Sequence, residues 1–257
     1  MATLWKALTW FDGKNCIDIG RFAVLVLNQP ITLPKRYMLD IWNGASFRAT
    51  ADGGTDRWYE FVASISSRDH TLKKIHPDLI SGDFDSVKPE TIKRCLENNV
   101  KMLKTPDQDK TDFTKALEEI WKETGGEIDS VITIVDNSGR LDHIMSNLNT
   151  LYEPHQHRLY LLGSNSLTWL LAPGLHHIEV PQSLVVSKAH CGLIPLGEPC
   201  TVTTTGLKWN LNKDKMQFGG LISTCNLFSE NNSGLVTVET DNPVLWTATV
   251  VRKDHSR

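Results

Sequence analysis

Two aspartates, Asp83 and Asp85, follow an apolar stretch that ends in Ser-Gly, with one phenylalanine between them. A folding core has no use for two carboxylates at the end of a predicted strand, because each buried charge needs a partner. A second acidic stretch, TPDQDKTD, adds Asp107, Asp109 and Asp112 between a predicted strand and a predicted helix. Any one of these aspartates could be a turn residue or a helix cap. Taken together, the two stretches indicate a site for a cation.

Further carboxylates follow other predicted strands: Asp52 in ATADGG, and Asp136 and Asp142 on either side of NSGR. Ligands of open α/β sheets bind outside the carboxyl ends of the strands, so neighbouring strands would bring these side chains to one rim. Their mutual repulsion requires a cation, and oxygen ligands without histidine or cysteine favour Mg²⁺, Mn²⁺ or Ca²⁺ over zinc. Arg140, which follows a glycine, offers paired donors to phosphate oxygens. This combination suggests a polyphosphate substrate.

The elements that position these residues alternate between strand and helix through the first two thirds of the chain. Short β-rich apolar runs alternate with stretches whose apolar residues recur at helical spacing. The run DSVITIVD is almost continuously apolar, as expected for a strand with both sheet faces covered. The alternation predicts an α/β domain with a mostly parallel sheet, which we assign to residues 20–172.

Beyond Pro173 and Gly174 the pattern changes. Short β-rich stretches such as SLVVS, CTVTTTG and GLVTVET are separated by Gly, Pro and Asn, and no convincing amphipathic helix is found. This pattern predicts an all-β sandwich or small barrel over residues 173–257. Residues 1–20 have weak periodicity, and we expect them to be partly disordered.

The bulk composition is that of a soluble globular protein. The 257-residue chain is 40% hydrophobic and 22% charged, with a formal net charge of −3. That charge provides no general attraction to nucleic acid or to an anionic membrane, and no apolar run is long enough to span a bilayer. The five cysteines form no C-x-x-C pair, so we expect reduced thiols. With no signal-peptide pattern at its start, the sequence predicts a cytoplasmic protein.

A set of motifs, in order along the chain, resembles those of the thiamine pyrophosphokinases, in particular the animal enzyme. The motifs are SGDFDS, TPDQDKTDFTKAL, GRLDHIMSNLNTLY, TTTGLKWNL and VTVETDNPVLW, and the resemblance spans roughly residues 22 to 250. It implies an N-terminal α/β domain, a C-terminal β domain, and a homodimer with active sites where the two subunits meet. The implied reaction transfers pyrophosphate from ATP to the hydroxyethyl group of thiamine, giving thiamine diphosphate and AMP.

The resemblance also implies roles for individual residues. The catalytic centre would consist of Mg²⁺ ligands, nucleotide contacts and a phosphate contact. The implied Mg²⁺ ligands are Asp83, Asp85 and Asp112, with Asp109 close by; the implied ATP contacts are Gln108, Asp109, Asp142 and, for a phosphate group, Arg140. The implied thiamine contacts are Trp209, Ser223 and Asn226. An indole suits both the cationic thiazolium and the flat aminopyrimidine, through cation–π contact and stacking.

The chain departs from the family pattern at two places. Val135 and Asp136 stand where a glycine pair is expected before Gly-Arg, which puts a side chain and a negative charge near the nucleotide phosphates. This departure bears on nucleotide affinity more than on the assignment. Cys225 stands where a serine is common.

Two other functions fit part of the sequence. A Mg²⁺-dependent nucleotide pyrophosphohydrolase would use the acidic rim, but it needs no second-substrate platform such as the GLKWNL stretch. A thiamine or nucleotide sensor without turnover is favoured only by the altered IVDNSGR stretch. AMP release from ATP, measured with and without thiamine, separates the three functions.

Overall fold

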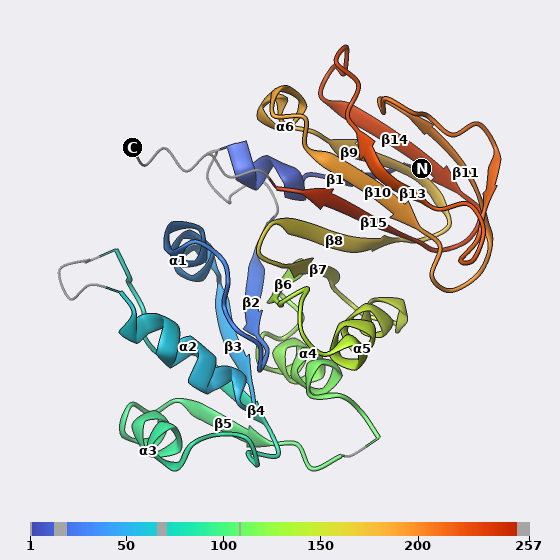
Figure 1. The fold of residues 1–257 in the computed structure, drawn as a ribbon. Helices are drawn as coiled ribbons and strands as arrows, with labels where there is room; N and C mark the ends of the chain where they lie inside the picture. The colour runs from blue at the N-terminus through green and yellow to red at the C-terminus, as the bar shows by residue number, and fades with distance from the viewer. Residues whose placement is uncertain (1, 13–19, 66–70, 108, 251–257) are drawn as a thin grey trace. The chain divides into compact units, whose positions relative to one another are not determined.

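The computed structural model describes residues 2–12, 20–65, 71–107 and 109–250 (Figure 1). The chain forms two compact units: the α/β unit, Gly20–Ser164, and the β unit, Met1–Ile19 with Asn165–Arg257. The division falls after Ser164, whereas we expected a boundary near residue 173. The reason is that the strand Ser166–Leu171 pairs along its whole length with a strand of the β unit.

A parallel sheet forms the centre of the α/β unit. Its described strands run in the order β7-β6-β2-β3-β4-β5, and every neighbouring pair is parallel. Strands β2 and β6 are buried at every position, which explains the continuously apolar sequence of β2 and the mostly apolar sequence of β6. The predicted α/β domain with a mostly parallel sheet is confirmed. The strands are β2 (Phe22–Val26), β3 (Phe47–Ala51), β4 (Leu79–Gly82), β5 (Lys101–Lys104), β6 (Ser130–Ile134) and β7 (Arg158–Leu162).

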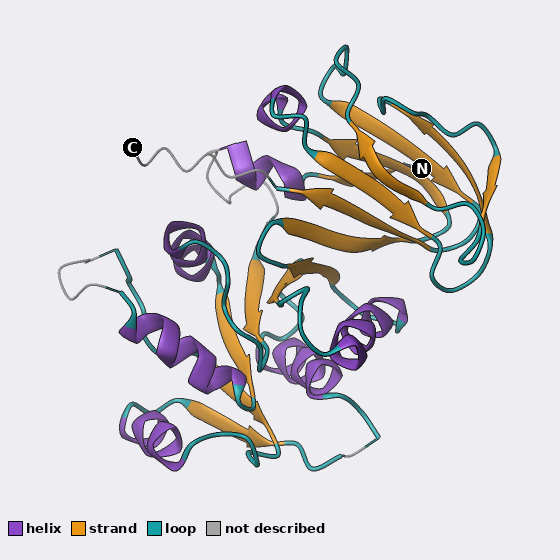
Figure 2. Ribbon diagram, in the orientation of Figure 1, coloured by secondary structure: helices purple, strands orange, loops and turns teal. Residues whose placement is uncertain are grey.

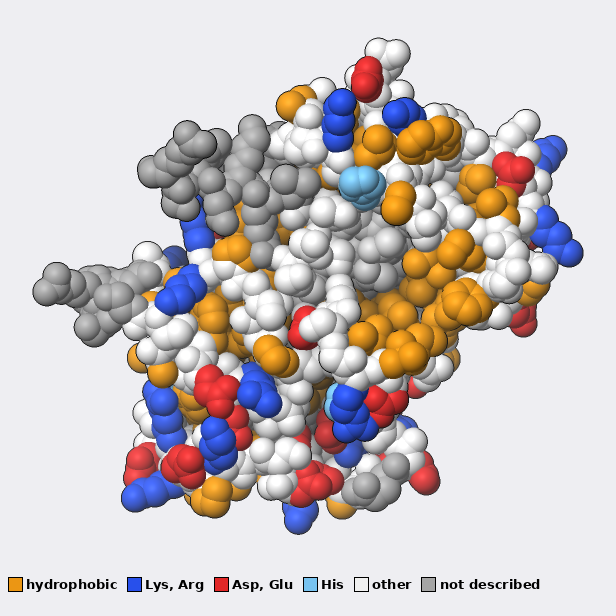
Figure 3. Space-filling view, viewed as in Figure 1, with side chains coloured by type: hydrophobic (Ala, Val, Ile, Leu, Met, Phe, Trp, Pro, Cys, Tyr) orange, Lys and Arg blue, Asp and Glu red, His pale blue; other side chains and the backbone are white. Residues whose placement is uncertain are grey.

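Helices connect these strands and flank the sheet on both sides (Figure 2). Their apolar faces pack inward: Trp42 is fully buried and stacks on Trp58, with the ring centroids 3.5 Å apart. On the viewed surface, charged side chains of both signs mix over this unit (Figure 3), as in the pairs of Glu60 with Arg57 and Lys88. Within the described ranges, no helix is both long and apolar enough to cross a membrane. The helices are α1 (Lys35–Gly44), α2 (Gly54–Ala63), α3 (Pro89–Glu97), α4 (Asp112–Glu123) and α5 (Leu141–Tyr152).

The carboxyl ends of the parallel strands lie along one edge of the sheet, which we call the rim. The backbone is crowded there. Gly54, the first residue of α2, lies so close to the end of β2 that a Cβ atom would stand 2.3 Å from the Val26 carbonyl oxygen. Glycine is therefore required where α2 begins. The close approach brings the loop after β3, which carries Asp52, against the rim.

Two packed sheets form the β unit, as the sandwich prediction requires. Their strand orders are β1-β9-β14-β11-β12 and β13-β10-β15-β8. Trp5 of the first sheet and Trp169 of the second have ring centroids 5.6 Å apart, so the core lies between the sheets. The strands are β1 (Thr3–Trp5), β8 (Ser166–Leu171), β9 (Gly174–Glu179), β10 (His190–Ile194), β11 (Cys200–Thr205), β12 (Asp214–Met216), β13 (Ser223–Leu227), β14 (Leu235–Thr240) and β15 (Val244–Thr249).

The start of the chain belongs to this sandwich, so the expectation of partial disorder is wrong for residues 2–12. Strand β1 pairs in parallel with β9, and the Trp5 indole donates to Nδ1 of His176 at 3.0 Å. The short helix η1 (Ala7–Asp12) follows, and residues 13–19 lie outside the described part. A three-residue edge strand is too short to produce a periodic pattern. A further short helix, α6 (Gln182–Val186), also interrupts the strands where no helix was expected.

Candidate functional site

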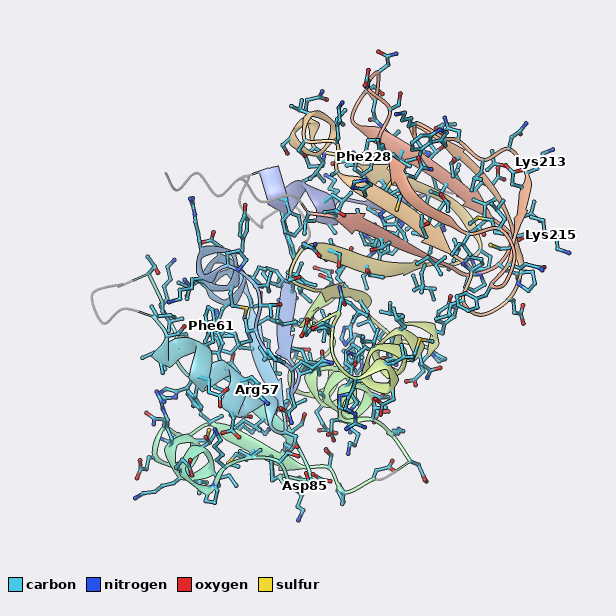
Figure 4. All side chains as sticks on the ribbon, in the orientation of Figure 1. Arg57, Phe61, Asp85, Lys213, Lys215 and Phe228 are labelled. Atoms are coloured by element: carbon cyan, nitrogen blue, oxygen red, sulfur yellow. The ribbon has the colours of Figure 1, made fainter. Side chains whose placement is uncertain are left out.

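Three carboxylates meet at the rim of the α/β unit. One oxygen each of Asp52, Asp83 and Asp85 lies within 4.8 Å of the other two. Asp52 follows β3, and the other two residues follow β4, the neighbouring strand. Asp52 is buried, Asp83 is half-buried and Asp85 is exposed on the loop after β4 (Figure 4). The structure thus brings together two of the three predicted metal ligands and adds Asp52.

Unusual backbone conformations hold this cluster together. Asp52 and Phe84 have φ angles of 45° and 66°, which are uncommon for residues that carry a side chain. Gly82, at φ 149°, packs so closely that a Cβ atom would stand 2.9 Å from Cβ of Asp52. The Asp85 amide donates to Oδ1 of Asp83 at 3.2 Å, which orients one carboxylate from within its own loop. Strained backbone of this kind concentrates at ligand sites.

Asp52 has the greatest need for a cation within the cluster. It is 4% exposed, and its Oδ1 accepts no hydrogen bond from the residues that the structure describes. Burial raises the pKa of this carboxyl, and repulsion by Asp112 and Asp85 adds to the rise. An unpartnered buried oxygen within an oxygen-only ligand set fits a hard divalent ion such as Mg²⁺. Sequence analysis placed Asp52 at the rim but not among the ligands, because only its burial distinguishes it from a turn residue.

Asp112, the third predicted ligand, is paired with a lysine. Its charge contributes to the raised pKa of Asp52, while its Oδ1 lies 2.8 Å from Nζ of Lys115. The Lys115 side chain is only 6% exposed. Its ammonium also donates to the carbonyl oxygens of Thr105 and Asp107, each at 3.1 Å. Sequence analysis missed Lys115, because a lysine within an amphipathic helix carries no signal of burial.

The loop between β5 and α4 carries two predicted nucleotide contacts. Gln108 lies outside the described residues. Asp109 is exposed, and its amide donates to Oδ1 of Asp107 at 2.8 Å. Asp109 therefore stands at the surface of the loop that Lys115 anchors, where a solute can reach it.

Arg140 and Asp142 pair with each other at the start of α5. Nε and Nη2 of the guanidinium lie 3.1 and 2.5 Å from the two carboxylate oxygens, and both side chains are mostly exposed. The hydrogen bond from Arg140 lowers the pKa of Asp142. An exposed ion pair contributes little stability, so the guanidinium exchanges its partner easily. Arg140 is thus available to an incoming phosphate group.

The residues that replace the expected glycine pair are accommodated in the loop after β6. Val135 is buried in the core. Asp136 turns back on its own loop and accepts from the amide and the hydroxyl of Ser138, at 3.2 and 2.6 Å. Its own amide donates to Oε1 of Gln29 at 2.9 Å. The Asp136 carboxylate therefore has protein donors of its own, which offset part of its charge.

A second candidate site lies in the β unit, around the side chain of Asn226. This residue is 3% exposed. Its Nδ2 donates to the Trp209 carbonyl at 2.8 Å, and its Oδ1 accepts from the Trp209 amide at 3.3 Å. Nδ2 also lies 3.3 Å from Oγ of Ser223. The structure thus brings together the three residues predicted to contact thiamine.

The indole of Trp209 is presented to solvent. The residue is 56% exposed, and Nζ of Lys208 lies 4.7 Å from the ring centroid. An isolated bridge between Leu207 and Phe228 fixes this segment beside β13. Cys225, at φ 56°, is exposed on the same strand. An exposed indole whose backbone is locked in place is a platform for a flat or cationic ligand.

Comparison with known proteins relates both units to one family. The thiamin pyrophosphokinase catalytic-domain model matches residues 38–162, and the vitamin B1 binding-domain model of the same enzyme matches residues 175–245. Thiamine pyrophosphokinase 1 of Arabidopsis thaliana is 37% identical over 238 residues, which cover 90% of this chain and 86% of the relative. Thiamin pyrophosphokinase 1 of Caenorhabditis elegans is 29% identical over 216 residues, covering 79% and 83%.

Solved structures show the same fold. Yeast thiamin pyrophosphokinase matches with a TM-score of 0.81 over 96% of this chain and 90% of that chain, at 21% sequence identity. Thiamin pyrophosphokinase from Candida albicans gives a TM-score of 0.80 over 97% and 93%, at 20% identity. At these identities the likeness concerns the fold alone.

Asp52→Asn is expected to stabilise the metal-free protein. A carboxyl whose folded-state pKa is raised contributes stability at low pH and loses it as the pH rises through that pKa, so the ionised side chain is unfavourable near neutral pH. Asparagine keeps an acceptor oxygen, lacks the charge and tolerates a positive φ. We expect the free energy of unfolding in chelator-treated protein to rise by about 1 kcal/mol, measured by urea denaturation.

The same variant should lose its response to divalent ions. Mg²⁺ should raise the unfolding free energy of the parent protein and leave that of Asp52→Asn unchanged. Asp85→Asn is the matched control, because Asp85 is exposed. Its metal-free stability should stay within about 0.5 kcal/mol of the parent value while its Mg²⁺ response is lost. A parent-like Mg²⁺ response in Asp52→Asn would remove Asp52 from the ligand set.

Proposed function

The chain belongs to the thiamin pyrophosphokinase family, and we propose that it transfers the pyrophosphoryl group of ATP to the hydroxyethyl group of thiamine. The products are thiamine diphosphate and AMP. The observation that carries this proposal is that the two family models cover the chain in order, each over a unit with its own candidate site. The acidic site suits a nucleotide with its metal ion, and the site at Trp209 suits thiamine.

Mg²⁺ is the ion that we assign to the acidic site. Asp52, Asp83 and Asp85 would hold it, with Asp112 beside them. The buried Oδ1 of Asp52, which accepts no hydrogen bond from any described residue, supports this assignment. When bound, Mg²⁺ would offset the negative charge of the phosphate groups. The protein's own contribution is to hold mutually repelling carboxylates together before the substrate arrives.

Arg140 would contact a phosphate group of ATP, while Gln108, Asp109 and Asp142 would contact the nucleotide. The guanidinium keeps its charge at every accessible pH and would exchange its bonds to Asp142 for bonds to phosphate oxygens. During transfer, negative charge moves toward the bridging oxygen of the departing AMP. A donor that tightens at that moment lowers the barrier, whereas one that binds ground-state ATP equally well does not.

Thiamine would bind at Trp209, beside Ser223 and Asn226. Contact between its thiazolium and a desolvated indole is worth about 1–2 kcal/mol. The amide of Asn226 already bonds to both backbone polar groups of Trp209, so its role would be to fix the indole. The Ser223 hydroxyl lies next to this amide and offers a donor to the ligand.

The transfer itself needs little covalent chemistry from the protein. The hydroxyl oxygen of thiamine forms a bond to the β-phosphorus of ATP and releases its proton. The bond from that phosphorus to the oxygen that joins it to the α-phosphorus breaks, and AMP leaves with this oxygen. Such reactions depend mainly on alignment of the two substrates and on stabilisation of the developing charge. The groups that would supply these effects are Asp83, Asp85, Asp112 and Arg140.

The active form would be a homodimer, located in the cytoplasm. The two candidate sites belong to different compact units, so a pair of subunits could combine the acidic site of one chain with the Trp209 site of the other. Four described cysteines are free thiols, in keeping with a reducing compartment. These are Cys95, Cys191, Cys200 and Cys225.

AMP release from ATP tests the proposed function. Purified protein with ATP and Mg²⁺ should release AMP only when thiamine is added, in step with thiamine diphosphate. Release without thiamine would indicate a pyrophosphohydrolase, and no release in either case would indicate a sensor.

Asp83→Asn should lower turnover roughly 10²-fold or more, with an unchanged circular dichroism spectrum, because the charge of the polyphosphate would lose part of its stabilisation.

Arg140→Ala is expected to reduce kcat roughly 10²–10³-fold, as for other single electrostatic stabilisers. Arg140→Lys should retain part of the activity, because lysine keeps the charge but loses the paired donors. Steady-state kinetics with ATP and thiamine varied separately would give kcat and KM for each variant. If kcat of Arg140→Ala equals that of the parent enzyme, Arg140 is only a solvated residue at a helix start.

Subunit mixing tests the proposed dimer. Asp83→Asn and Trp209→Ala should each be inactive, since one lacks a metal ligand and the other lacks the thiamine platform. Unfolding and refolding them together should restore up to about a quarter of the parent activity, because half of the sites in a mixed dimer receive both intact surfaces and half of the dimers are mixed. Heterodimers identified by differential tags that stay inactive would show that each site is built within one chain.

A further inference from the structure

We infer that Lys115 is a positioning residue of the acidic site, which holds Asp112 and the loop between β5 and α4 in the arrangement that receives the divalent ion. The inference rests on the proposed function, through which Asp112 enters the site. It concerns a residue that stands in the motif TPDQDKTDFTKAL but was given no role from the sequence. Among the residues that the structure describes, Lys115 is one of the few charged side chains that are buried, with 5% of the residue exposed.

The ammonium group of Lys115 has a full set of partners. Nζ lies 2.8 Å from Oδ1 of Asp112 and 3.1 Å from the carbonyl oxygens of Thr105 and Asp107. The contacts with the two carbonyl oxygens are hydrogen bonds and the contact with Asp112 is an ion pair, so the ammonium is both hydrogen-bonded and neutralised. Because a buried ammonium without partners is very unfavourable, the position of each acceptor is tightly constrained.

The choice of acceptors shows that the lysine does more than neutralise a carboxylate. To neutralise Asp112, Lys115 needs only the ion pair between Nζ and Oδ1 of Asp112. The other two reach the backbone at separate points of one loop, and Asp107 in turn receives the amide of Asp109. Lys115 therefore holds the chain at two points after β5, Thr105 and Asp107.

A neighbouring lysine provides the contrast. Nζ of Lys110 lies 2.5 Å from Oε1 of Glu118, and both side chains are more than 40% exposed: 44% and 43%. A pair of this kind contributes little, because solvent screens it. Lys110 lies in the loop just before α4 and Lys115 lies in the first turns of α4, and the two differ in burial, so Lys110 serves as a matched control for the loss of a lysine charge in this region.

Loss of Lys115 would act on Asp112 first. The Asp112 side chain is 42% exposed. Without the ammonium of Lys115 it can rotate into solvent, which moves its charge away from the cluster. The loop would lose both carbonyl anchors at the same time. Mg²⁺ and Mn²⁺ require closely defined ligand positions, and loss of a residue that orients ligands typically weakens metal binding by 10–100-fold.

The two possible roles of Lys115 predict opposite results for metal affinity. If the lysine only offsets charge, its removal makes the site more negative and a divalent cation binds more tightly. If it positions the ligands, its removal weakens binding despite the more favourable charge. Affinity for the ion alone therefore separates the roles, with neither ATP nor thiamine present.

The experiment measures free Mn²⁺ by electron paramagnetic resonance during titration of the full-length protein. Lys115→Met should weaken Mn²⁺ binding roughly tenfold or more, and the polar variant Lys115→Gln should do the same. Lys110→Gln should stay within about twofold of the parent. In an Asp112→Asn background, adding Lys115→Met should weaken binding by a smaller factor than it does in the parent, because the part of its effect that acts through Asp112 is already lost.

Several outcomes would overturn the inference. Unchanged or tighter Mn²⁺ binding in folded Lys115→Met would leave the lysine as a counter-charge only. Full additivity of the two substitutions would show that Lys115 does not act through Asp112. Loss of folding in both Lys115 variants, seen by circular dichroism and urea denaturation, would make the residue a structural one. Failure of the proposed function has a different signature, since the parent protein would then bind Mn²⁺ but release no AMP in response to thiamine.

Discussion

Mutual repulsion among carboxylates at the ends of β3 and β4 is the constraint on which the rim of the α/β unit depends. Asp52 is buried beside Asp83 and Asp85, and both burial and neighbouring charge oppose its ionisation. The parallel sheet brings these residues together because its strand ends share one edge. A glycine contact and two positive φ angles then hold the loops where a free chain would not place them. Binding of a divalent ion is therefore coupled to the stability of the folded state.

The candidate site of the β unit is held by hydrogen bonds and contains no cluster of like charges among the described residues. It contains a single indole, exposed to solvent, whose placement depends on one buried amide. Asn226 hydrogen-bonds to both backbone polar groups of Trp209, so the backbone that carries the indole is held by neutral hydrogen bonds. At the acidic site the carboxylates repel one another until a cation binds. At the site in the β unit the buried amide already has its hydrogen-bond partners, and the exposed indole is free to contact a ligand.

How far the sequence predicts this structure depends on the range of the interaction involved. The acidic motifs at strand ends, and the change from strand–helix alternation to β-strands alone, were predicted from the sequence. Residue types and the local spacing of apolar residues suffice for both. The role of Asp52 was not, because burial is set by the packing of Gly82 against it. The role of Lys115 was not predicted, because two of its partners are backbone carbonyl groups, which residue types do not reveal. The roles at Trp209 came only from the resemblance, since its amide partner lies 17 residues away.

The early strand and the unit boundary were mispredicted for a related reason. Strand β1 is defined by pairing with β9, which lies more than half the chain away, and by the bond from Trp5 to His176. Strand β8 belongs to the β unit through pairing with β15, although it directly follows the last strand of the α/β unit in sequence. Pairing between strands that lie far apart in the sequence cannot be predicted from the local pattern of apolar and polar residues.

The contact between Lys208 and Trp209 means that the indole already carries a cation. A positively charged ligand that stacks on this ring displaces an ammonium as well as water, so its binding is an exchange of one cation for another. The net gain is the difference between two contacts, increased by the rotamer freedom and hydration that the released lysine recovers in solvent. Because an ammonium is strongly hydrated, a broad and weakly hydrated heteroaromatic cation competes well for the ring. Simple inorganic cations and small amines, which hold their water tightly, do not.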